Sequence, residues 1–225
     1  MIYVFRGGVI EAEGQTLVAD CKHGKWRVEN GRLEWQTGGP PPPIDWLVPQ
    51  PIDMGFHVLV EYLLSMCEYR WRNSNEKVVI ALVGPSGSGK TTYFRRLLGR
   101  PHDGSATVGA ESATVHVEGR PVTLYDLPGH RELSALPERP DGVLVFAPLD
   151  ELLLEEVAWY LLAARPRAAA VVGTKADLGH VEFLADYAEY FRSAGLNVVA
   201  SYVVVTTREP RWRLAEILVA LVDAL

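Results

Sequence analysis

The sequence lacks several features that mark whole classes of proteins. Its 225 residues include only two cysteines, Cys21 and Cys67, which excludes a disulfide scaffold and favours a reducing cytoplasm. No apolar run approaches the roughly 20 residues needed to span a bilayer, and the first residues lack the apolar core of a signal peptide. A formal charge of −6 argues against nucleic acid as the main partner. We therefore expect a cytoplasmic protein with no transmembrane segment. Any contact with a membrane is expected to be peripheral or to be made through a partner.

Composition divides the chain into four parts: a small unit at 1–39, a proline-rich linker at 40–53, an amphipathic helix with its connection at 54–76, and an α/β domain at 77–225. With 48% apolar residues the chain can bury a sizeable core. The last part alternates strand-like and helix-like runs, which predicts a mostly parallel six-stranded sheet with helices on both faces. The expected strands are 78–83, 113–118, 121–126, 142–147, 168–173 and 198–205, and the expected helices are 90–98, 150–164, 181–194 and 211–224.

The first part carries the pattern of a β-hairpin. Asn30-Gly31 suits a two-residue type I′ turn. Counting outward from the turn gives one apolar face and one face of opposite charges, because it pairs Glu29 with Arg32, Val28 with Leu33, Arg27 with Glu34 and Trp26 with Trp35. Residues 2–5, 9–12 and 16–20 are expected to form further short strands. Since such a β-unit buries little by itself, we expect it to pack on the rest of the chain, on a partner or on a second copy.

A phosphate-binding loop follows the first strand of the α/β part. Residues 84–91 read Gly-Pro-Ser-Gly-Ser-Gly-Lys-Thr after the apolar run 78–83, which is the G-x-x-x-x-G-K-[ST] motif between a strand and a helix. The glycines allow successive N–H groups to point inward and form an anion-binding nest. Lys90 is expected to reach the β- and γ-phosphates, and the Thr91 hydroxyl to bind Mg²⁺. The phosphate-binding set is Gly84, Ser86, Gly87, Ser88, Gly89, Lys90 and Thr91.

Two further segments indicate a γ-phosphate and its metal ion. Asp126 ends an expected strand and can hold the Mg²⁺ shell through water, and the Gly129 amide can touch a γ-phosphate because no side chain blocks its approach. An isolated D-x-x-G is also an ordinary turn. Thr107 can offer its hydroxyl to Mg²⁺ and its amide to the γ-phosphate, a contact that exists only in the triphosphate state and therefore predicts a switch. Thr114 is a rival for that role, but it lies within a strand pattern.

The segment Thr174-Lys175-Ala176-Asp177, after an apolar run, matches the guanine-reading pattern [NT]-K-x-D. The Asp177 carboxylate can accept hydrogen bonds from guanine N1–H and the 2-amino group, whereas adenine offers an acceptor at N1 and no 2-amino group. The Lys175 stem can cover the face of the base. The alternative is a loop with a solvated lysine and a helix-capping aspartate. The combination with the phosphate loop favours GTP and GDP, bound with Mg²⁺.

Together these motifs resemble the Ras superfamily of small GTPases over about residues 77–225, and within it the Arf/Sar branch and the β-subunit of the signal recognition particle receptor. Thr107-Val108-Gly109 and Asp126-Leu127-Pro128-Gly129-His130 carry the closer resemblance. It implies a P-loop NTPase G domain in which Thr92 joins the phosphate ligands and His130 orients the attacking water, with Lys90 and Gly129 as the other catalytic groups. It also implies that Thr206 and Thr207 contact guanine, with the Thr207 amide on O6.

The chain departs from that family in several places. Ser86 stands where many Ras members have glycine, and residues 130–141 leave little room for a full second-switch helix. The chain has neither the N-terminal glycine typical of Arf proteins nor a C-terminal prenylation cysteine. The expected helix at 55–72 lies where relatives place a membrane attachment, but Glu61 and Glu68 on its polar stripe favour a core or protein interface instead.

These observations predict a GTP-binding and GTP-hydrolysing switch that recruits or regulates a protein partner, with membrane targeting or trafficking as the setting that the resemblance suggests. Intrinsic hydrolysis is expected to be slow. One alternative is a structural subunit that holds GTP permanently. The other is a P-loop kinase or ATPase, for which Arg95, Arg96 and Arg100 could supply a lid, although Asp177 would then have no role.

Overall fold

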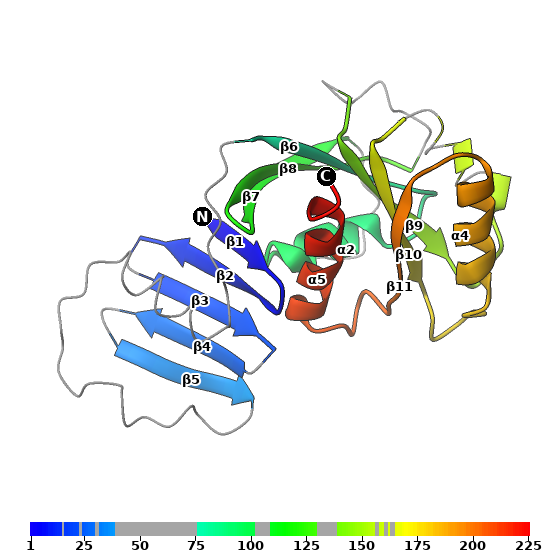
Figure 1. The fold of residues 1–225 in the computed structure, drawn as a ribbon. Coiled ribbons are helices and arrows are strands. Elements are labelled where there is room, and N and C mark those ends of the chain that lie inside the picture. The colour runs from blue at the N-terminus through cyan, green and yellow to red at the C-terminus, as the bar shows by residue number, and fades with distance from the viewer. Residues whose placement is uncertain are drawn as a thin grey trace.

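The computed structural model describes residues 1–14, 16–22, 24–29, 32–38, 76–101, 109–129, 139–155, 158–159, 162 and 165–225. Within these residues the strands form one 11-stranded sheet in the order β11-β10-β9-β6-β8-β7-β1-β2-β3-β4-β5 (Figure 1). The six strands at the first end of that order are β6 (Val78–Val83), β7 (Glu111–Val117), β8 (Arg120–Asp126), β9 (Gly142–Pro148), β10 (Ala168–Thr174) and β11 (Val198–Val203). The helices are α2 (Lys90–Leu97), α4 (Phe183–Ser193) and α5 (Arg211–Val222). All of these elements start and end within two residues of the predicted bounds.

The two faces of the six-stranded part are covered by different helices, as predicted. All strands pair in parallel except β7 and β8, which pair antiparallel. One core joins α2 and α5 to alternate residues of the central strands, such as Ile80 and Leu144, and the other joins α4 to their neighbours, such as Ala81 and Val143. Every residue of β9 is buried, which is why this run reads as continuously apolar rather than alternating. The predicted α/β fold class is confirmed.

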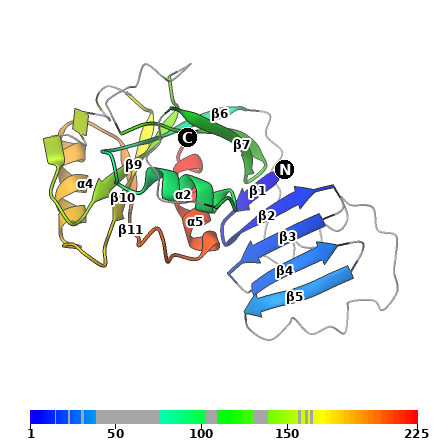
Figure 2. The ribbon, with the colours of Figure 1, turned by 180° about the vertical axis from the view of Figure 1, so that it is seen from behind.

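The N-terminal strands continue the same sheet rather than forming a separate layer. They are β1 (Ile2–Phe5), β2 (Gly8–Glu13), β3 (Thr16–Cys21), β4 (Gly24–Glu29) and β5 (Arg32–Gly38), joined as an antiparallel ladder. The predicted β4–β5 register is confirmed, including the Trp26–Trp35 pair. The ladder joins the α/β part where β1 runs parallel to β7, with Tyr3 opposite His116 and Val4 opposite Val117. Figure 2 shows the ladder extending from the β7 side of the sheet beside α5.

A partly buried charged cluster fastens the ladder to the helices. The guanidinium of Arg211, at the start of α5, donates to the carbonyl oxygen of Leu97 at the end of α2 and forms an ion pair with Glu11 on β2. Burial lowers the pKa of Arg211, and the nearby Glu11 carboxylate opposes that shift. Burial also raises the pKa of Asp20 on β3, against the attraction of Lys25 and Arg211.

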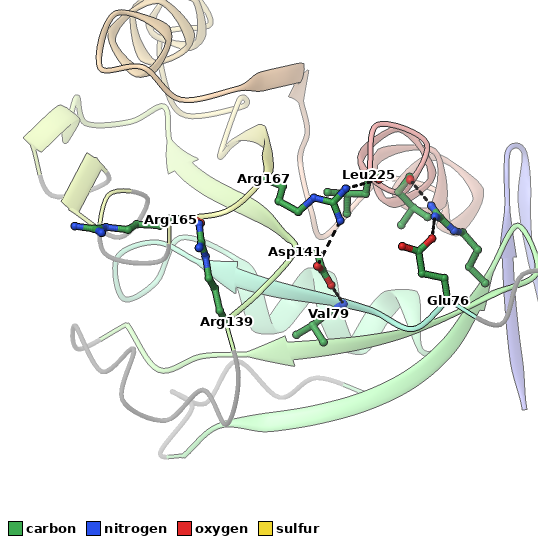
Figure 3. Close-up of polar contacts among 9 residues, drawn as sticks. Glu76, Val79, Arg139, Asp141, Arg165, Arg167 and Leu225 are labelled. Carbon is green, nitrogen blue, oxygen red and sulfur yellow. Dashed lines mark hydrogen bonds and ion pairs between the residues drawn. The ribbon is translucent and has the colours of Figure 1, made fainter.

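A second polar network lies at the starting ends of the parallel strands, away from the loops that carry the motifs (Figure 3). The Asp141 carboxylate accepts from the backbone N–H of Val79 at 2.9 Å and lies 3.8 Å from the guanidinium of Arg167, which in turn donates to the C-terminal residue Leu225. This network ties together the beginnings of β6, β9 and β10. We read it as structural, because it joins strand ends to the end of the chain.

Several predicted features lie outside the described residues: the linker at 40–53, the helix at 55–72 and part of the helix at 150–164. The division of the chain into 1–39, 40–53, 54–76 and 77–225 therefore stays a prediction. Cys21 takes part in a disulfide, and the other cysteine of the sequence, Cys67, lies outside the described residues. The cysteines consequently give no support to the expected reducing compartment. Among the described helices, none is both long and apolar enough to cross a bilayer.

Candidate nucleotide site

The predicted site loops gather at one edge of the sheet. Strands β6, β8, β9, β10 and β11 run in the same direction, so their carboxyl ends meet at this edge. Residues 84–90 follow β6, Asp126 ends β8, Thr174 ends β10 and residues 204–210 follow β11. Crevices outside the carboxyl ends of parallel strands are where ligands bind in open α/β sheets.

The phosphate loop has the backbone that its glycines predict. Gly84, Gly87 and Gly89 have φ angles of 141°, 72° and 90°, a region that side chains with a Cβ rarely adopt. A Cβ on Gly84 would also meet the backbone carbonyl of Phe146, so this position tolerates glycine alone. The buried ammonium of Lys90 donates to the carbonyl oxygens of Gly84 and Pro85, each at 2.8 Å. Lys90 is thereby held across the mouth of the loop.

Thr91, which directly follows the phosphate-loop lysine, forms a hydrogen bond with Asp126 at the end of β8. The Thr91 hydroxyl donates to Asp126 Oδ2 at 2.6 Å, and Asp126 is fully buried. A hydroxyl and a carboxylate are hard oxygen donors of the kind that Mg²⁺ takes, together with waters and phosphate oxygens. The pair therefore fits the predicted magnesium site. Thr92 follows in the first turn of α2, half-buried.

Gly129 lies directly against the phosphate loop. A Cβ on this residue would lie 2.5 Å from Ser86 Cα and 2.9 Å from the carbonyl carbon of Pro85, so a side chain has no room. The backbone after Asp126 thus reaches the exposed tip of the loop, where Ser86 and Gly87 face solvent. The predicted contact of the Gly129 amide with a γ-phosphate stays a prediction.

The predicted guanine-reading segment is tied to the phosphate loop. The buried Thr174 hydroxyl donates to the carbonyl oxygen of Ser88 at 2.8 Å. Lys175 has a φ of 57° and its ammonium lies 2.8 Å from Asp150, while Arg208 lies 3.5 Å from Asp177. Asp150 and Arg208 were not singled out from the sequence. No motif marks them, because they are brought to the segment by the ends of β9 and β11.

The loop after β11 packs beside the phosphate loop. Thr206 is buried, and its hydroxyl oxygen lies 3.0 Å from the position that a Cβ on Gly89 would take. Thr207 is exposed at the same edge. The guanidinium of Arg96, on α2, donates to the carbonyl oxygens of Thr207 and Glu209. Sequence reasoning considered Arg95, Arg96 and Arg100 as lid residues, but Arg95 and Arg100 instead form ion pairs with Glu111.

Two predicted site residues, Thr107 and His130, lie outside the described residues. The described residues nearest to them in the sequence are Gly109, two residues before β7, and Gly129, which lies against the phosphate loop. Their proposed roles therefore rest on the sequence pattern and on the family resemblance.

The fold and these loops together define a class of protein. One edge of a mostly parallel sheet carries a phosphate loop, a buried aspartate at a neighbouring strand end and a Thr-Lys-x-Asp segment. This is the fold of P-loop GTPases. A family model described as "Signal recognition particle receptor beta subunit" matches residues 74–137, under a third of the chain. That stretch contains the phosphate loop and the segment from Asp126 to Gly129. The predicted resemblance to small GTPases of this kind is confirmed there.

A solved structure with the same fold is "Crystal structure of bacterial selenocysteine-specific elongation factor EF-Sec". It matches with a TM-score of 0.53 and 17% sequence identity, over 66% of this chain and 29% of that chain. This chain therefore corresponds to less than a third of that protein, and the likeness concerns the fold. No curated protein sequence matches the chain.

Proposed function

We propose that this protein is a GTP-binding switch that hydrolyses GTP and recruits or regulates a protein partner. The observation that carries the proposal is the meeting, at one edge of the sheet, of the phosphate loop, the Thr91–Asp126 pair and the Thr174–Asp177 segment. The hydrogen bond between Thr174 and Ser88 joins the phosphate end of such a site to its base end. A guanine base would then lie against Lys175 and be read by Asp177.

Mg²⁺ would be held by Thr91, by Asp126 through water and by Thr107 in the triphosphate state, and when bound it would neutralise charge on the phosphate oxygens. Lys90 lies where it can move from the carbonyl oxygens of its own loop to the β- and γ-phosphates. Gly129 would donate its amide to the γ-phosphate, and His130 would orient the attacking water. Because these groups mainly position and stabilise charge, we expect slow intrinsic hydrolysis.

The switch would act through the segments around Thr107 and Gly129, and these would order together only when a γ-phosphate is bound. The partner would read that ordered surface, alone or with the N-terminal ladder. The match to the receptor β-subunit makes a membrane-targeting complex the first setting to examine, with membrane contact made through the partner or peripherally.

The first test is the nucleotide preference of the purified protein. Affinities for GTP, GDP, ATP and XTP are measured with Mg²⁺ and again after chelation with EDTA. Asp177→Asn is compared with the parent, and Asp186→Asn serves as a control because it makes the same change on the exposed surface of α4. We expect GTP and GDP to bind far more tightly than ATP, Mg²⁺ removal to weaken GTP, and Asp177→Asn alone to shift preference toward XTP.

The result that would overturn the proposal is binding of ATP as tight as GTP, with Asp177→Asn indistinguishable from the parent; a P-loop kinase or ATPase would then be the better reading. Single-turnover hydrolysis with and without a captured partner separates the remaining alternative. A cycling switch releases phosphate slowly alone and faster with its regulator, whereas a permanently loaded structural subunit retains GTP in both cases.

A further inference from the structure

The turn at residues 205–209 has few hydrogen bonds of its own. The backbone N–H groups of Arg208 and Glu209 both donate to the carbonyl oxygen of Val205, at 2.8 and 3.0 Å. Thr207 and Arg208 are exposed. Among the described residues, the Thr207 N–H donates to no backbone acceptor in this turn. A turn with so few internal bonds needs an outside contact to keep one conformation.

Arg96 supplies that contact from α2. Its Nη1 donates to the carbonyl oxygen of Thr207 at 2.8 Å and its Nη2 to that of Glu209 at 2.6 Å. Both bonds are charge-assisted, and the planar guanidinium fixes their relative direction. The Nε of Arg96 is buried without a hydrogen-bond partner among the described residues, so the side chain gives up one bond in keeping this fork.

The fork fixes the peptide unit that follows the Thr207 side chain. The carbonyl oxygen of the peptide between Thr207 and Arg208 accepts from Arg96, and its N–H donates to Val205. With both groups of this unit held, the adjoining Thr207 N–H has little freedom to turn away from the site edge. A hydrogen-bond donor that is aimed in advance contributes more to recognition than one that must be ordered on binding.

The helix that carries Arg96 is itself rigidly placed. It begins at the phosphate loop with Lys90, and the buried Tyr93 hydroxyl donates to the carbonyl oxygen of Leu214 on α5 at 2.9 Å. Arg96 therefore connects the phosphate end of the proposed site to its base end through a single helix. The Thr206 hydroxyl lies 3.0 Å from the position that a Cβ on Gly89 would take, so the loop after β11 also lies close to the phosphate loop.

We propose that Arg96 is a positioning residue that determines base specificity, by holding residues 206–209 so that the Thr207 amide faces guanine O6. This inference rests on the proposed guanine-nucleotide function. Arg96 itself does not touch the base. Its loss would weaken the reading of O6 and leave the reading of N1–H and the 2-amino group by Asp177 intact.

The test compares GTP with two analogues in the purified full-length protein. In 6-thio-GTP the O6 atom is replaced by sulfur, a weak acceptor, while N1–H and the 2-amino group remain. ITP keeps O6 and lacks the 2-amino group, so it reports on Asp177. For the parent we expect GTP to bind about tenfold more tightly than 6-thio-GTP, the value of one well-placed hydrogen bond. In Arg96→Ala we expect that preference to fall to about twofold or less, with the GTP to ITP ratio unchanged.

Two further variants separate positioning from a general loss of structure. Arg96→Lys keeps the charge without the fork and should give an intermediate preference. Arg95→Ala removes a charge from the next residue, which contacts Glu111 instead, and should leave both ratios at the parent values. An Arg96→Ala protein that weakens all three nucleotides equally, or none, would overturn the inference. A parent protein that prefers GTP over ATP but binds GTP and 6-thio-GTP equally well would also overturn the inference. A parent protein that binds ATP as tightly as GTP would instead overturn the proposed function itself.

Discussion

Replacing Arg211 should weaken the attachment of the N-terminal ladder to the helices. The effect should be larger than that of removing an exposed contact at the same junction. This side chain is 11% exposed and its partner Glu11 is 33% exposed. It also donates twice to the carbonyl oxygen of Leu97, at 2.8 and 2.6 Å. One guanidinium thus joins β2, the end of α2 and the start of α5.

The cost of Arg211→Met can be worked from these contacts. Removing one partner of a fully buried ion pair costs about 3–5 kcal/mol, because the other charge stays buried and uncompensated. Since water reaches part of Glu11, we expect about 2–3 kcal/mol in the free energy of unfolding. That corresponds to a fall of roughly 5–10 °C in the melting temperature of a chain of this size. Methionine keeps the apolar stem, so the loss reports mainly on the polar contacts.

Urea unfolding of the parent, Arg211→Met, Glu11→Gln and the double variant measures the coupling. We expect Glu11→Gln to cost about 1 kcal/mol, and the double variant to cost less than the sum of the two by about 1 kcal/mol or more. Arg6→Ala is the control, because the Arg6–Asp223 pair joins the same ladder to α5 at 70% and 35% exposure and should contribute under about 1 kcal/mol. Additive single effects, or equal costs for Arg6→Ala and Arg211→Met, would refute the reasoning.

Two further outcomes follow from the structure. Gly129→Ala should lower affinity for GTP, because its Cβ would lie 2.5 Å from Ser86 Cα and force about 1–3 kcal/mol of displacement. The loss should be larger for GTP than for GDP, because only GTP carries the γ-phosphate to which the Gly129 amide is proposed to donate. Gly109→Ala, whose added Cβ would have no described atom within 4 Å, should change little; equal losses of GTP and GDP affinity in Gly129→Ala would contradict this. Burial, and secondarily the N-terminal ammonium, lower the pKa of His116 opposite Tyr3. The unfolded chain then binds more protons, so stability should fall as the pH drops below about 6.5, and a urea titration of His116→Gln should show a flatter pH dependence.

The elements of the α/β part could be predicted because their patterns are local. Buried parallel strands read as continuous apolar runs, and α5 repeats its apolar residues at helical spacing. The β4–β5 register followed from Asn30-Gly31 and the period of two, since a one-residue slip would no longer pair Trp26 with Trp35. The phosphate loop, Asp126 and Asp177 could be proposed as site residues because the chemistry of their proposed ligands restricts both residue type and spacing.

Residues that act through packing had no such signal. Arg96 and Arg211 were indistinguishable from other arginines in the sequence, because their hydrogen bonds are accepted by backbone carbonyl oxygens, which every residue possesses. Asp150 and Arg208 reach Lys175 and Asp177 only once the ends of neighbouring strands are placed together.

By itself the sequence determined the α/β class, the hairpin and the loops that define the proposed nucleotide site. Turn chemistry, hydrophobic period and ligand chemistry each depend on residues that are close together in the sequence. The tertiary structure alone decided that the N-terminal ladder extends the sheet at β7, as the parallel pairing of β1 with β7 uses backbone groups that carry no sequence code. It also decided which arginines hold the helices and the loop after β11, because those contacts join residues more than 100 positions apart.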